Sequence, residues 1–149
     1  MKVTRTITGD EPVLLPDMKQ YLRVTHSEED ANILRMITFA RQQLEYATGR
    51  SLVEQTIELE VEIDGIYYLP YGPISTISDI TVEGDDVVVV DNGTTGKGTL
   101  IAEYDAGPYE CQYPVMEYVA HMYGNHEGGN IPESVKRWIM NNTLNLWLQ

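Results

Sequence analysis

The chain has 149 residues, of which 42% are hydrophobic and 22% are charged, a composition typical of one globular domain rather than a disordered chain. Its formal net charge of −13 argues against a protein that wraps nucleic acid, because that binding depends on Lys and Arg displacing counterions from phosphates. The single cysteine excludes an internal disulfide. No apolar run approaches the roughly 18 residues of a membrane span, and the first residues lack the apolar core of a signal peptide. We therefore expect a soluble, intracellular protein.

Two helices are predicted near the N-terminus, a short one over 14–24 and a long one over 27–48. Ser27 and Asp30 match the S/T-x-x-D/E capping pattern at the start of the long helix. Gly49 is well placed to end it with a left-handed residue. Apolar residues spaced three and four apart predict a continuous buried stripe along the long helix, comprising Ile33, Ile37, Ala40, Leu44 and Ala47.

After Arg50 the periodicity changes from helical to alternating. Between Ile57 and Ile63, apolar residues alternate with glutamates, which predicts a strand with one buried and one solvated face. Turn residues at YGP, EGDD and DNGTTGKG separate shorter apolar runs. The sequence therefore predicts a small antiparallel sheet whose further strands cover 67–69, 77–82, 87–90 and 99–104.

Helical spacing returns near the C-terminus. One helix is predicted over 114–126, and a last helix begins at Pro132 and continues through Leu146 towards the end of the chain. The expected fold class is α+β: N-terminal helices including one long helix, a central small antiparallel β region, and C-terminal helices packed on the long helix. We expect residues 1–149 to form a single domain, a helical core with a β insertion at about 52–105.

The residues that suggest catalysis or metal binding do not form a complete pattern. Glu117 and His121 lie four residues apart on a predicted helix, but His126 is rotated away from their face, and zinc requires at least a third ligand. Cys111 is more typical of a small packing residue than of a nucleophile, and no G-x-S-x-G motif is present. We expect no enzyme activity, no cofactor and no metal.

Two loop motifs are better explained by turns than by ligands. The stretch DNGTTGKGT contains glycines and a lysine, but Asp91 occupies the position of the first glycine of a phosphate-binding loop, and Gly98 that of its Ser or Thr. A hairpin loop is predicted there. The acidic residues around it do not have the spacing of a calcium loop and predict a solvated hairpin tip; they are Glu83, Asp85, Asp86 and Asp91.

The C-terminal segment LNLWLQ carries more apolar side chains than one helix face can bury in a single core. One interpretation is that the segment folds back into its own domain. The other is a surface covered by a second copy or by another protein, because exposed apolar patches of this kind mark contacts. The excess of tyrosine, ten against one phenylalanine, favours contacts weakly. The predicted interaction residues are Trp138, Leu144, Trp147 and Leu148.

The chain contains MKQYLRV, then a long helix that ends in EYATGR, then QTIELEV and YYLPYGPISTISDITV. In this order, these motifs resemble the head-tail connector (adaptor) family of tailed bacteriophages and prophages. The resemblance begins at MKQYLRV and continues through an acidic cap and a long helix that ends in E-x-x-T-G-R, here Glu45 to Arg50. It then follows the strand QTIELEV, the L-P-x-x-P-I segment of YYLPYGPISTISDITV, the strand end EYDAGPY and the helix PVMEYVAHMYGNHEG. Asn125, His126 and Glu127 replace the family's usual basic pair, and the helical pattern from Ile131 to Gln149 is longer than in many members.

The resemblance implies a structural protein of the virion neck, assembled in the host cytoplasm. Its copies would form a homo-oligomeric ring, roughly dodecameric, below the portal protein, with individual subunits monomeric before assembly. The ring would extend the channel for genomic DNA and dock a downstream neck or tail protein. Two alternatives remain: a tail-completion or stopper protein, which tends to be mainly β, and a small metal-dependent hydrolase that uses Glu117, His121 and His126.

Overall fold

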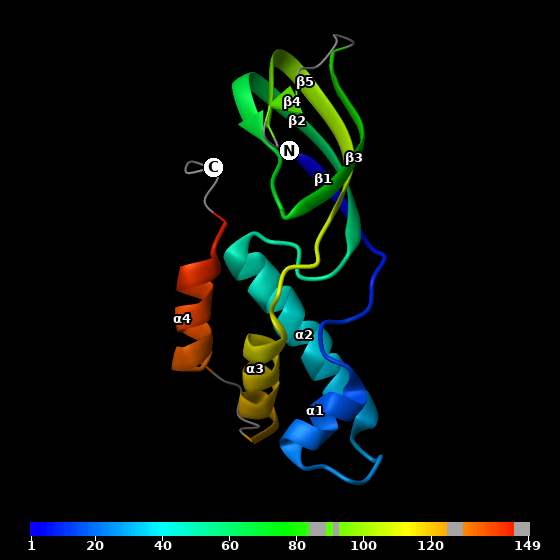
Figure 1. Cartoon of the computed structure of the whole chain (residues 1–149), viewed down its shortest axis with the longest axis vertical. Coiled ribbons are helices and arrows are strands. Elements are labelled where there is room, and N and C mark those ends of the chain that lie inside the picture. Colours follow the sequence, from blue (N-terminus) through cyan, green and yellow to red (C-terminus); the bar gives the residue numbers. More distant parts are fainter. Residues whose placement is uncertain (84–88, 91–92, 125–129, 145–149) are drawn as a thin grey trace. The chain divides into compact units, whose positions relative to one another are not determined.

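The computed structural model describes residues 1–83, 89–90, 93–124 and 130–144, and it confirms the predicted α+β class (Figure 1). The chain divides into two compact units. The β unit contains Met1–Asp10 and Gly49–Tyr109, together with Leu144; the helical unit contains Glu11–Thr48 and Glu110–Thr143. The N-terminal residues therefore belong to the same unit as the central strands.

The helical unit is built around one long helix. Its elements are α1 (Leu15–Leu22), α2 (Asp30–Thr48), α3 (Gln112–Gly124) and α4 (Glu133–Asn142). The helices α1, α3 and α4 all contact α2. The buried apolar side chains come from all four helices, so α2 provides the surface on which the unit is assembled; they include Met18, Ile33, Ile37, Leu44, Val115, Val119 and Val135.

The long helix starts three residues later than predicted. Residues 27–29 form a turn, in which the Asp30 N–H donates to the Ser27 carbonyl at 3.3 Å, and the helix begins at Asp30. The Asp30 carboxylate lies 2.8 Å from Lys19 Nζ of α1. Ser27 is therefore not where the helix begins, and the Asp30 carboxylate forms an ion pair with α1.

The buried stripe of α2 also differs from the prediction at its C-terminal end. Ala47 is exposed, whereas its neighbour Thr48 is buried and its hydroxyl donates to the Leu44 carbonyl at 2.7 Å. Two charged residues, Arg41 and Glu45, are also buried. The stripe therefore contains polar positions that an apolar periodicity does not detect.

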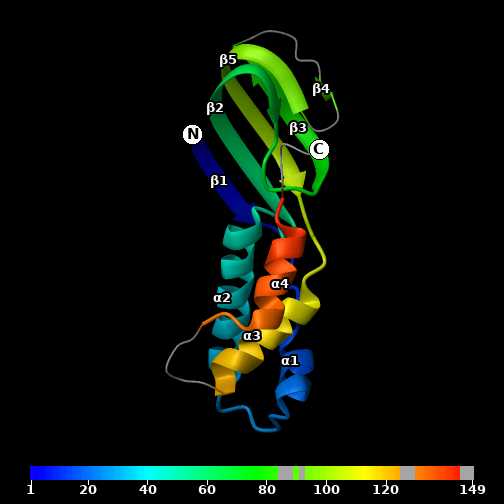
Figure 2. The same cartoon turned by 90° about the vertical axis from the view of Figure 1, so that its left-hand side faces the viewer.

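The β unit is an antiparallel sheet with the strand order β1-β2-β5-β3, and β4 pairs with β5 (Figure 2). Its strands are β1 (Lys2–Ile7), β2 (Gln55–Tyr68), β3 (Ile74–Val82), β4 (Val89–Val90) and β5 (Gly93–Ala106). One face of the sheet, together with Leu69 just after β2, supplies a hydrophobic core of Ile57, Leu59, Ile63, Leu69, Val82, Leu100, Ala102, Tyr104 and Ala106.

The two central strands are longer than predicted. The separate strands expected over 57–63 and 67–69 form one strand, β2, which continues through Gly65 at φ +103°. The hairpin loop predicted at DNGTTGKG was wrong over Gly93–Gly98, because these residues belong to β5 and pair with β2 in a continuous register. Pairing with a neighbouring strand thus overrides the turn preference of the glycines.

The N-terminal strand β1 was not predicted. It pairs with β2 so that Lys2 lies opposite Glu60 and Ile7 lies opposite Gln55. Its residues Val3 and Thr4 are β-branched, which favours a strand, but six residues give too short an alternation to be distinguished from an irregular terminus.

Candidate interaction surfaces

A buried ion-pair network holds the centre of the helical unit. Arg41 of α2 is 6% exposed and contacts both oxygens of Glu11, with Nε–Oε2 at 3.0 Å and Nη2–Oε1 at 2.8 Å. Its Nη1 atom lies 2.6 Å from Oε1 of Glu45, one turn further along α2. The hydrogen bonds to Glu11, followed by those to Glu45, raise the pKa of Arg41 against the opposing effect of burial.

This network fixes the position of α2 from its inner side. Glu11 precedes α1 in the sequence, and the Thr38 hydroxyl also donates to Glu11 Oε1 at 3.2 Å. The bidentate Arg41–Glu11 pair therefore connects the segment before α1 to the middle of α2 with a defined geometry. A helix held in this way presents its opposite face in a fixed orientation.

We call that opposite face the α2 outer face. All of its residues are exposed, and Tyr46 is the most exposed large apolar side chain of the described residues, at 89%. Phe39 is 45% exposed. The residues repeat at the three- and four-residue spacing of one helix side; they are Asn32, Arg35, Phe39, Gln42, Gln43 and Tyr46.

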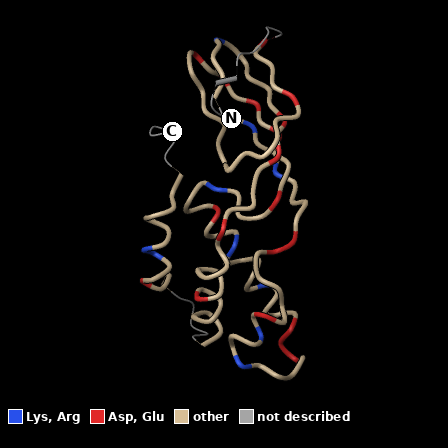
Figure 3. The backbone as a smooth tube through the Cα atoms, viewed as in Figure 1, with Lys and Arg blue, Asp and Glu red and all other residues tan. Residues whose placement is uncertain are grey.

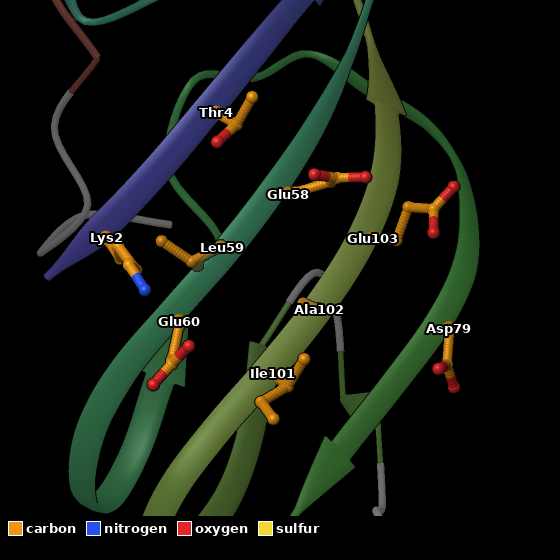
Figure 4. A pocket seen from close by; sticks show the side chains of 9 residues that line it. All are labelled: Lys2, Thr4, Glu58, Leu59, Glu60, Asp79, Ile101, Ala102 and Glu103. Carbon is orange, nitrogen blue, oxygen red and sulfur yellow. The ribbon is translucent and has the colours of Figure 1, made fainter.

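The solvated face of the sheet is strongly acidic. In the strand register, Glu58 of β2 lies opposite Glu103 of β5, and Glu103 lies opposite Asp79 of β3. All three are exposed, and they form a row across three adjacent strands (Figure 4). Lys2 and Glu60 also line this shallow depression of about 400 Å³. Like charges in directly opposite positions are unfavourable for a sheet, so this row is not explained by stability.

The acidic character extends beyond this row. The sequence contains 23 Asp and Glu residues against 10 Lys and Arg, and acidic residues occur in both units (Figure 3). A surface with this excess of negative charge repels other polyanions over several ångströms.

The four interaction residues predicted from the C-terminal segment are only partly described. Trp138 on α4 and Leu144 beyond it are both half-buried. Trp147 and Leu148 lie outside the described residues. The proposed C-terminal contact surface therefore stays a prediction.

The last helix is shorter than predicted, because α4 ends at Asn142 and does not continue to Leu146. The Asn142 side-chain amide donates to the Trp138 carbonyl at 2.8 Å, and the Thr143 hydroxyl donates to the Ile139 carbonyl at 2.6 Å. These two side chains donate to carbonyls that would accept backbone N–H groups if the helix continued for another turn. The backbone of Thr143 is extended, at φ −63° and ψ 130°.

The candidate metal and catalytic residues do not converge in the part of the chain that the structure describes. The Glu117 carboxylate accepts a hydrogen bond from the Ser134 hydroxyl, His121 is half-buried, and His126 lies outside the described residues. Among the described residues, no three His, Cys, Asp or Glu side chains lie close enough together to hold a metal ion. Within the same residues, no helix is sufficiently long and apolar to cross a bilayer.

Cys111 is buried, and burial together with the nearby carboxylates of Glu110, Glu45 and Glu11 raises the pKa of its thiol to about 12. The reactive thiolate is therefore nearly absent at neutral pH. We expect the native protein to resist iodoacetamide between pH 7 and 9 and to react fully in denaturant, as measured by intact mass. Rapid native labelling at pH 8 would contradict this assignment.

The E-x-x-T-G-R segment at the end of α2 has a structural explanation. Glu45 pairs with Arg41, and Gly49 adopts φ +69°, a left-handed conformation that ends helices. Arg50 follows in the β unit, where its guanidinium lies 4.2 Å from the centre of the Tyr109 ring. Each residue of the motif thus forms a local contact or a helix end.

Comparison with known proteins identifies the fold but not a family. No protein family profile matches the sequence, and no curated protein matches it. Two solved structures from gene transfer agent (GTA) particles have the same fold over nearly their whole length. A chain from the neck of an empty GTA particle, computed with C6 symmetry, matches with a TM-score of 0.73 and 14% identity, covering 98% of this chain and 97% of that one. A chain from the virion of a native GTA particle matches with a TM-score of 0.70 and 15% identity over the same shares.

Proposed function

We propose that this chain is a structural protein of the neck of a phage-like particle, and more specifically a head-tail connector. The observation that carries the proposal is the agreement in fold, over 98% of the chain, with a chain from the neck of a GTA particle. The order of sequence motifs from MKQYLRV to PVMEYVAHMYGNHEG supports the same class independently. In this role, copies form a ring below the portal protein, extend the DNA channel and provide a docking surface for the next neck or tail protein. The protein acts in the virion neck after assembly in the host cytoplasm.

We propose a ring of roughly twelve subunits. The neck structure that shares this fold was computed with C6 symmetry. Twelve copies are compatible with that symmetry, because two subunits can occupy each sixfold repeat. A ring uses a heterologous contact in which each subunit presents two different, complementary surfaces to its neighbours.

The acidic surface suits a channel through which DNA passes without adhering. Phosphate binding requires cations, and the row of Glu58, Glu103 and Asp79 offers none. We expect the wild-type protein not to retard duplex DNA in a gel at ~100 mM salt, and the triple variant Glu58→Lys, Asp79→Lys, Glu103→Lys to retard it. Tight DNA binding by the wild type at this salt would contradict a non-adhesive channel.

A tail-completion or stopper protein is the nearest alternative. Such proteins tend to be mainly β, whereas the helical unit here contributes four described helices, including the 19-residue α2. This proportion favours the connector. We propose no enzyme activity and no cofactor, since Glu117 is hydrogen-bonded to Ser134 and the Cys111 thiol is protonated at neutral pH.

The decisive experiment is to mix the purified protein with the portal protein of the same particle and to examine the mixture by negative-stain microscopy and native mass spectrometry. The connector role predicts rings of this chain stacked on portal rings. If the protein stays monomeric with the portal and instead joins a preassembled connector, it is a stopper or completion protein, and the proposal is overturned.

A further inference from the structure

The α2 outer face consists of exposed residues of the types found at protein contacts. It carries an arginine, two aromatic rings and three amides over about 21 Å of helix, from Asn32 to Tyr46 at 1.5 Å per residue. Tyrosine, phenylalanine and arginine are enriched at interfaces, where Tyr and Arg are frequent energetic anchors. A tyrosine that is 89% exposed on a rigid helix gains no burial within its own chain.

The charge of this face is opposite to that of the chain as a whole. The chain has 23 acidic residues, yet none lies among the six residues of the outer face, whose one charged residue is Arg35. The face therefore suits an acidic, hydrogen-bonding surface and lacks the carboxylates that would repel one. A second copy of this chain, at a net charge of −13, provides such a surface.

The two aromatic side chains differ in how firmly they are held. The Phe39 ring meets the buried Tyr118 of α3 edge to face, with centroids 6.3 Å apart and an interplanar angle of 89°. The Arg41 network fixes the backbone of α2 from the opposite side. Phe39 is thus a preorganised anchor that loses little side-chain entropy on binding, and Tyr46, two turns further along, supplies most of the free aromatic area.

We propose that the α2 outer face docks against an adjacent copy of this chain, with Phe39 and Tyr46 as apolar anchors and Arg35 paired with an acidic residue of that copy. This inference rests on the proposed ring, and it identifies one of the two surfaces that each subunit uses. The spacing of Asn32, Arg35, Phe39, Gln42 and Tyr46 by three and four residues is that of a helix seam packed along a neighbouring element.

Two matched pairs of variants test the assignment in the ring assay with portal. Arg35→Glu changes the charge of the outer face by −2, and Arg137→Glu makes the same change at an exposed site on α4. Tyr46→Ser removes an aromatic ring from the outer face, and Tyr113→Ser removes one from α3, where Tyr113 is 66% exposed. We expect Arg35→Glu and Tyr46→Ser to reduce ring yield at least tenfold, with both controls close to the wild type. All four proteins should keep the wild-type circular dichroism, because the substituted side chains are exposed.

Cross-linking identifies the occupant directly. Cys111 is buried, so a single exposed thiol can be introduced with Gln43→Cys, an exposed position of the outer face that is not one of its anchors, and coupled to a photoreactive maleimide before assembly. Cross-links from position 43 to peptides of this same chain support the proposal. Cross-links only to portal or to another neck protein overturn this inference but leave the connector function in place. Normal ring yield from both Arg35→Glu and Tyr46→Ser has the same consequence. A wild-type protein that forms no rings alone or with portal overturns both the connector function and this inference.

Discussion

Replacing Arg41 with methionine is expected to lower the free energy of unfolding by about 3–5 kcal/mol, the range found when one partner of a buried ion pair is removed. Methionine retains much of the side-chain volume but removes the guanidinium that contacts Glu11 and Glu45. Glu45, which is 4% exposed, then loses its ion pair with Arg41. Urea titration followed by circular dichroism measures the change.

Two further variants separate charge burial from general damage to α2. Arg35→Met alters an exposed arginine of the same helix and should change stability by less than about 0.5 kcal/mol. Arg41→Met combined with Glu45→Leu also removes the buried Glu45 carboxylate and should recover part of the loss. A loss below about 1 kcal/mol for Arg41→Met alone would show that the network contributes little.

Gly107→Ala is the second substitution with a large expected effect. Gly107 has φ +81°, and a Cβ atom built there lies 2.3 Å from the Val53 carbonyl oxygen and 3.0 Å from that of Ser51. The left-handed backbone alone costs a non-glycine residue about 1–3 kcal/mol. The overlap with main-chain atoms adds to this cost, because backbone cannot rotate away as a flexible side chain can. We therefore expect the thermal midpoint to fall steeply, as measured by scanning calorimetry.

Two glycines provide the controls for this prediction. Gly65 also has a positive φ, +103°, but a Cβ atom there meets nothing within 4 Å, so Gly65→Ala should show the conformational cost alone. Gly124 ends α3 with neither a positive φ nor a close neighbour, and Gly124→Ala should have little effect. Equal decreases in the thermal midpoint for Gly107→Ala and Gly65→Ala would show that the overlap with the Val53 carbonyl is relieved in solution.

The result for Gly107 bears on how the sequence motif EYDAGPY is interpreted. The Gly107 N–H donates to the Pro73 carbonyl at 2.8 Å. The main chain around Gly107 leaves no room for a side chain at this position. The glycine of this motif is therefore required by the packing of the chain as it leaves β5.

Local periodicity determined the element types along most of the chain. The three- and four-residue spacing of Ile33, Ile37, Ala40 and Leu44 predicted a buried stripe, and all four are buried. The alternation from Ile57 to Ile63 predicted a strand with a solvated acidic face, which β2 forms. These patterns succeed because burial of one face imposes a repeat of about 3.6 or 2 residues on the sequence itself.

The candidate surfaces were harder to predict, because periodicity identifies only the residues that an element buries. The C-terminal segment attracted attention because it is apolar, but Trp138 and Leu144 are half-buried and Trp147 and Leu148 lie outside the described residues. Phe39 and Tyr46 were missed, although their seven-residue spacing is visible in the sequence. An amphipathic pattern identifies the face that a helix buries; it does not show which exposed aromatic side chains find no cover in the folded chain.

Tertiary structure decided the features that depend on residues distant in sequence. Burial of Arg41 depends on Glu11, thirty residues earlier, which supplies a bidentate carboxylate in addition to the local Glu45. The glycines from Gly93 to Gly98 became part of a strand because β2 lies in register beside them. The sequence by itself determined where most of the helices and strands form, with β1 as an exception, because those propensities act between near neighbours. Long-range partners determined how far the strands extend, which charges are buried and which aromatic side chains stay exposed, because the free energy of each comes from contacts that exist only after the chain has folded.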